Sequence, residues 1–153
     1  MVRPLLEYCC VVWDPHQEKL VRQLENVHRS GARFVAGKPF NRRNPDSVTK
    51  ILEDLGWEPL MHRRRRTKLT FMYKMVNGII DIPMTHFPER KERASTRHAN
   101  NHQFLQPQAN LQLYQHSYVP STVPFWNRLP DDVISAPSVT TFKQRLAKIE
   151  MTP

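Results

Sequence analysis

The side chains that could perform metal-dependent chemistry in this 153-residue sequence are few and scattered. A two-metal polymerase or nuclease site needs carboxylates that are held close together. The adjacent acids are Glu53-Asp54, which we expect near a helix end, and Asp131-Asp132, which follow a proline. Neither pair follows a predicted strand, and a turn or a helix start explains the second pair more simply. We therefore predict that the chain holds no catalytic metal site.

Zinc ligands and nucleophiles are equally sparse. His98 and His102 are four residues apart, a spacing that could bind Zn²⁺ on a helix, but they lie in an Asn-rich segment without nearby Cys or Glu. The adjacent Cys9 and Cys10 cannot form a C-x-x-C site or a disulfide framework, so we expect them to pack in the core. The four glycines form no phosphate-binding loop. The chain alone is predicted to be no enzyme and to bind no metal, cofactor or small-molecule substrate.

Cations are the most abundant functional groups in the sequence. It contains 23 Lys and Arg against 14 Asp and Glu, a net charge of +9, and most of the excess lies in the first half. A chain with a pI near 10.0 favours a polyanionic partner. We therefore interpret the basic residues as candidate contacts to a nucleic-acid backbone.

The most basic run is Arg63–Arg66, on a helix predicted over residues 58–77. Successive helical residues differ by about 100°, so the four arginines cannot share one role. Arg65 falls in the middle of the apolar face, and we predict that it is structural, bound to a carboxylate or to helix-end carbonyls, because an unpaired buried charge is costly. Arg63, Arg66 and Lys74 share the opposite face and are predicted phosphate contacts. The apolar face consists of Met61, Leu69, Met72 and Val76.

A second helix is predicted to begin at Asp14, with Gln17 in a capping-box spacing, and to end at Ala36 before Gly37. Its apolar stripe is Leu20, Leu24, Val27, Gly31 and Phe34. The glycine in this stripe predicts the close approach of another helix. The opposite face carries Lys19, Arg22, Arg29 and Arg33.

Two of these cations have acidic partners four residues earlier. Glu18–Arg22 and Glu25–Arg29 are predicted ion pairs on a solvated face, which leaves Arg33 as the freer cation. Arg33 is therefore a predicted nucleic-acid contact, together with Arg42 and Arg43 of the basic loop that follows.

The fold predicted around these residues is mainly α, a small helical bundle with a short β-hairpin and irregular loops in its C-terminal half. A basic helical module covers residues 1–80, a linker covers 81–100, and a small subdomain covers 101–153. The hairpin pairs 102–108 with 111–119, and two short helices follow it. Further helices are predicted over 2–13 and 47–55. Trp13 and Trp126 are predicted structural residues, and no stretch is apolar enough to span a membrane.

Five motifs, in order, resemble one known family. They are VRPLLEYCCVVWDP (2–15), LENVHRSGARFVAG (24–37), LEDLGWEPLMHRRRRTKLTFMYKMVNG (52–78), TRH (96–98) and FWNRLPDDVISAPSVTTFKQRL (125–146). Together they are similar to the region just downstream of the polymerase core in LINE-type (non-LTR) retrotransposon reverse transcriptases. The chain departs from the family pattern at residues 27–32, where Gln-Arg-Arg-Ala is usual, and this weakens the basic face.

The resemblance implies a fragment of an RNA-directed DNA polymerase, corresponding to the end of the thumb and the segment after it. Such a segment grips the template–primer backbone without sequence preference, and the palm aspartates of the parent enzyme, with Mg²⁺, perform catalysis. No YADD-like or FADD-like sequence occurs here, and the uncapped start at Met1 agrees with a truncated copy. The implied partners are RNA or DNA and the missing polymerase core, in the nucleus or the cytoplasm. The alternative is a stand-alone interaction module whose apolar 2–13 surface docks on a protein.

Overall fold

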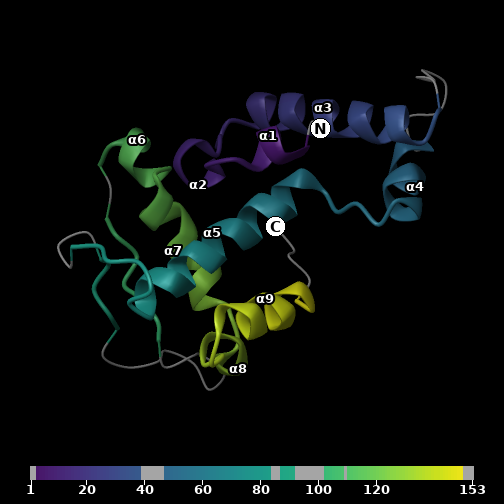
Figure 1. Cartoon of the computed structure of the whole chain (residues 1–153). Coiled ribbons are helices and arrows are strands. Elements are labelled where there is room, and N and C mark those ends of the chain that lie inside the picture. The colour runs from purple at the N-terminus through teal and green to yellow at the C-terminus, as the bar shows by residue number, and fades with distance from the viewer. Residues whose placement is uncertain (1–2, 39–46, 84–86, 92–101, 109, 150–153) are drawn as a thin grey trace. The chain divides into compact units, whose positions relative to one another are not determined.

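The computed structural model describes residues 3–38, 47–83, 87–91, 102–108 and 110–149 (Figure 1). The described part is mainly helical, as predicted, and its only β pairing is an isolated antiparallel bridge between Arg90 and Phe104. The chain divides into two compact units, Met1–Arg64 and Arg65–Pro153. The division falls inside a helix, whereas we placed a boundary after residue 80.

The first unit contains α1 (Arg3–Glu7), α2 (Cys10–Trp13), α3 (Glu18–Val35), α4 (Ser47–Asp54) and the first turn of α5 (Leu60–Val76) (Figure 1). Both α1 and α4 pack against α3. The small core of this unit is formed by Ala32, Val48, Ile51 and Leu52, with Ala36, Leu55 and Trp57 at its edge. Glycines with positive φ follow α3, α4 and α5, and the first of them, Gly37, ends its helix as predicted.

The single helix predicted over residues 2–13 is wrong, because the chain breaks at Cys9. This residue has a φ of 50°, in the left-handed region, and separates α1 from α2. The indole N–H of Trp13 donates to the Tyr8 carbonyl at 2.5 Å, so it satisfies an oxygen at the break. Cys10 is buried, as predicted, but Cys9 is exposed.

The capping box predicted at Asp14 is also wrong. The N-cap of α3 is Gln17, whose side chain makes no capping hydrogen bond. The Asp14 carboxylate is drawn away from the helix start by the Arg64 guanidinium, whose Nε lies 2.9 Å from Asp14 Oδ1. An ion pair with a buried arginine therefore replaces the local cap.

The second unit contains the rest of α5 together with α6 (Gln112–Gln115), α7 (Tyr118–Asn127), α8 (Asp131–Ile134) and α9 (Val139–Ala147) (Figure 1). Its core contains an aromatic cluster, in which the Phe142 ring stacks on Tyr73 at 4.4 Å between centroids and on Trp126 at 6.3 Å. Trp126 is fully buried, and its indole N–H donates to the His102 carbonyl at 3.0 Å. Ser138 caps α9 by accepting the Thr141 N–H.

The predicted hairpin is wrong, because most of residues 111–119 fold into α6 and the start of α7. The alternating Leu111 and Leu113 are both exposed, so their pattern does not mark a buried sheet face. The backbone of Phe104 pairs with a side chain on its other edge: it donates to Asn127 Oδ1 at 2.9 Å and accepts from Asn127 Nδ2 at 2.8 Å. The Asn127 amide therefore forms the two hydrogen bonds with the Phe104 backbone that a paired strand would form.

Candidate nucleic-acid interface

Arg63 and Arg64, in the first turns of α5, bind acids of the first unit. The Arg63 guanidinium donates to both Glu7 oxygens, at 2.5 and 2.9 Å. This hydrogen bond raises the pKa of Arg63, against the opposing effect of partial burial. Arg64 is 1% exposed, and besides its ion pair with Asp14 it lies 6.0 Å from the Trp13 ring centroid. Both arginines therefore hold α1, α2 and α5 together.

Arg65 and Arg66 bind groups of the second unit. The Arg65 guanidinium lies over the Phe125 ring, 4.1 Å from its centroid, a cation–π contact that we did not predict. Arg66 Nη2 donates to the carbonyl of Ala147, the last residue of α9, at 3.2 Å. Every arginine of the run therefore contacts its own chain, and Arg63 and Arg66 are less available to phosphate than we predicted.

Arg64 is the deeply buried arginine of this run, and sequence reasoning missed it. The two ends of α5 belong to different units, so a single buried face does not describe the whole helix. The first turn buries Leu60 and Arg64, four residues apart, whereas the later turns bury Leu69, Met72 and Tyr73. The four-residue spacing from Leu60 was the signal that could have identified Arg64.

The outward face of α3 is the other basic surface. We name Lys19, Arg22, Asn26 and Arg29 the α3 basic face; all four are exposed. The predicted Glu18–Arg22 pair is confirmed, at 2.5 Å on the surface. The predicted Glu25–Arg29 pair is wrong, because both Glu25 oxygens accept the Leu60 N–H, at 3.1 and 3.3 Å. Arg33 is partly buried and has interactions of its own, so it is not the freer cation.

The contact between Glu25 and Leu60 explains why α3 presents this face outward. Leu60 is the first residue of α5, where the helix has unsatisfied N–H groups and a carboxylate is favoured. On the same side of α3, the buried His28 ring stacks on Trp57 at 5.4 Å, and Ala32 is fully buried. Glu25, His28 and Ala32 therefore fix the inward side of α3, and its basic face remains in solvent.

The apolar stripe predicted on α3 is largely uncovered. Leu20 and Val27 are exposed, and Phe34 is 88% exposed. A Cβ added at Gly31 would meet nothing within 4 Å, so the close helix approach that we predicted does not occur among the described residues.

The predicted site residues belong to different parts of the chain. Arg33 and Arg63 belong to the first unit, and Arg66 and Lys74 belong to the second. Lys74 is partly exposed in the last turn of α5, where its carbonyl accepts the Ile79 N–H. Arg42 and Arg43 lie outside the described residues.

Within the ranges that the structure describes, no cluster of three or more His, Cys, Asp or Glu could bind a metal ion. No helix in the same ranges is both long and apolar enough to cross a membrane. Comparisons with protein-family models, with curated proteins and with solved structures find no match for this chain.

Proposed function

We propose that the chain is a non-catalytic module of an RNA-directed DNA polymerase of the non-LTR retrotransposon type, and that it binds the backbone of template and primer. The α3 basic face is the observation that carries the binding part of the proposal. The five ordered motifs support the parent class. Under this proposal the polymerase core is the partner in the nucleus or the cytoplasm, and it supplies catalysis with its own Mg²⁺.

The spacing of the α3 basic face suits a phosphate backbone. Lys19 and Arg29 are ten residues apart, about 15 Å along the helix axis, and Arg22 and Asn26 lie between them. The Arg22–Glu18 pair is exposed, and such pairs contribute only about 0.2–1 kcal/mol, so a phosphate can replace the carboxylate at small cost. Such contacts to the phosphates do not distinguish one base sequence from another.

The experiment is a salt titration with a fluorescent RNA–DNA duplex of random sequence and the full chain. In the double variant Lys19→Gln with Arg29→Gln, we expect weaker binding and a log–log salt slope that is smaller by about 2, one for each lost phosphate contact. The control is Lys143→Gln with Lys148→Gln, which removes the same charge from two exposed positions, one on α9 and one just after it. If the two double variants weaken binding equally, net charge and not the α3 basic face is responsible.

The second candidate function is a protein-interaction module, and a separate observation favours it. Leu5, Tyr8 and Val12, on and between α1 and α2, are all more than 70% exposed. Neighbouring exposed apolar side chains typically mark a protein interface. Absence of duplex binding even at low salt would favour this candidate, because a backbone-binding module binds most tightly there.

A further inference from the structure

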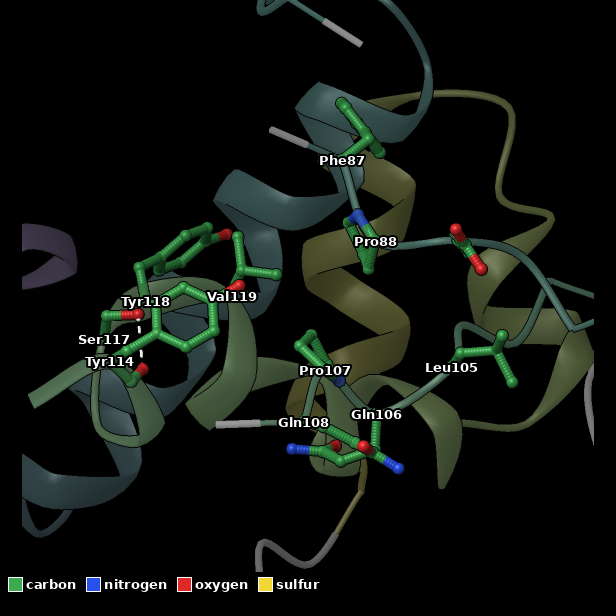
Figure 2. A pocket seen from close by; sticks show the side chains of 11 residues that line it. Phe87, Pro88, Leu105, Gln106, Pro107, Gln108, Tyr114, Ser117, Tyr118 and Val119 are labelled. Atoms are coloured by element: carbon green, nitrogen blue, oxygen red, sulfur yellow. Dashed lines mark hydrogen bonds between the residues drawn. The ribbon is translucent and has the colours of Figure 1, made fainter. Parts of the chain in front are cut away.

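A cavity of about 740 Å³ lies within the second unit (Figure 2). Its volume is within the range of about 300–1,000 Å³ that is typical of small-molecule sites. Flat or rigid apolar groups form most of its walls, from the extended segments 87–89 and 105–108 and from the region of α6 and α7. In Figure 2 the residues Tyr114, Ser117 and Tyr118 lie on one side of the cavity, Phe87 and Pro88 above it, and Pro107 with Gln106 and Gln108 below.

Three side-chain donors of this lining are used within the protein. The Tyr118 hydroxyl donates to the Lys68 carbonyl at 2.9 Å, and the Ser117 hydroxyl donates to the Tyr114 carbonyl at 2.7 Å. Gln106 Nε2 donates to the Pro120 carbonyl at 2.9 Å. The side-chain groups that remain for a ligand include two acceptors, Gln106 Oε1 and the exposed Glu89 carboxylate, and two groups that both donate and accept, the exposed Gln108 amide and the Tyr114 hydroxyl.

We propose that this cavity binds an unpaired nucleobase that carries an exocyclic amino group. Tyr114 is 48% exposed and lines the cavity, so its ring is accessible for base stacking. Amide and carboxylate oxygens accept hydrogen bonds from the amino groups of adenine and cytosine. Of the residues that line the cavity, none is Lys, Arg or His. The site therefore takes the base, and the phosphates stay outside it.

The same inventory disfavours a proline-rich peptide, the other flat ligand that aromatic grooves bind. A polyproline segment has no N–H at its prolines and presents carbonyl acceptors. Such a segment would use only donors of the groove, and the Tyr118 and Ser117 hydroxyls are already used. It would leave the acceptors Gln106 Oε1 and Glu89 without a hydrogen bond, whereas the amino group of a base can donate to them.

The experiment titrates the full chain with free nucleosides and follows the backbone amide chemical shifts of residues 105, 106, 108 and 114–119. Adenosine is expected to shift these amides, and uridine, whose base has no amino group, is expected to bind several-fold more weakly. Tyr114→Ala should weaken adenosine binding about fivefold or more, whereas Tyr114→Phe, which keeps the ring, should retain it. The control is Tyr8→Ala, which removes an exposed tyrosine on the other unit.

The proposal rests on the proposed function only in taking a nucleic-acid strand as the source of the base. Nucleosides carry no phosphate, so this titration can fail while duplex binding remains salt-dependent, and the reverse can also occur. No shift of these amides at millimolar adenosine would overturn the proposal, and so would equal binding of uridine. A proline-rich peptide that shifts the same amides while adenosine does not would identify a peptide site instead.

Discussion

The Arg64 guanidinium lies 2.9 Å from the Asp14 carboxylate in the first unit, with only 1% of the arginine side chain exposed. Together with the neighbouring Arg63–Glu7 pair, this contact joins the start of α5 to the chain around α1 and α2. The basic run Arg63–Arg66, in which we predicted nucleic-acid contacts, therefore has in part a structural role.

We expect Arg64→Ala to lower the free energy of unfolding by about 3 kcal/mol, because removing one partner strands a poorly solvated charge on the other. The measurement is chemical denaturation of the full chain. The control is Arg22→Ala, which breaks an ion pair of similar kind on the surface, where 73% of the arginine side chain is exposed. It should cost less than about 1 kcal/mol. Equal losses in the two variants would contradict a structural role for Arg64.

Burial raises the pKa of Tyr118, and this predicts a loss of stability at alkaline pH. The unfolded chain ionises this phenol near pH 10, whereas the folded chain keeps it neutral. The stabilisation from Tyr118 is therefore complete below pH 10 and falls by up to about 1.4 kcal/mol per pH unit above it. Tyr118→Phe should flatten the alkaline part of a stability–pH profile, at a cost of about 1 kcal/mol at neutral pH for the lost hydrogen bond to Lys68.

Identical pH profiles for Tyr118→Phe and the unchanged protein above pH 10 would contradict this assignment. Absorbance at 295 nm provides an independent measurement, since one tyrosine should ionise only when the second unit unfolds.

The third prediction concerns Asn127, whose side-chain amide binds both the N–H and the carbonyl of Phe104. Asn127→Ala removes both the acceptor of the Phe104 N–H and the donor to the Phe104 carbonyl. We expect the free energy of unfolding to fall by about 1–3 kcal/mol and the Phe104 amide to exchange faster. Asn26→Ala makes the same change at an exposed position on α3 and should leave both measurements nearly unchanged. A protected Phe104 amide in Asn127→Ala would show that the Asn127 side chain does not bind the Phe104 backbone.

Local signals in the sequence predicted one end of α3 but not the other. Gly37 follows α3 with positive φ, as predicted, because this feature depends on a few adjacent residues. The hairpin prediction was wrong because the Phe104 backbone pairs with the Asn127 side chain, which is more than twenty residues away in the sequence. No periodicity in the segment 102–119 contains that information.

The candidate site was predicted less well, for a related reason. Helical spacing correctly places Lys19, Arg22 and Arg29 on one face of α3, because that depends only on the helix. The partners of Arg63 and Arg64 are Glu7 and Asp14, about fifty residues away, and tertiary packing alone brings these groups together. Charge pairs at that separation cannot be found from i,i+4 spacing.

The adjacent cysteines provide a fourth prediction, in which the same substitution has opposite effects at neighbouring positions. Cys9 is exposed with a φ of 50°, a conformation that costs a non-glycine residue about 1–2 kcal/mol. Cys9→Gly should therefore raise the free energy of unfolding, although the greater freedom of glycine in the unfolded chain limits the gain to about 1 kcal/mol or less. Cys10→Gly should lower it by more than about 1 kcal/mol, because Cys10 is fully buried and helical. Thermal denaturation of both variants under reducing conditions measures the two signs. A lower stability for Cys9→Gly would mean that α1 continues into α2 without the break at this residue.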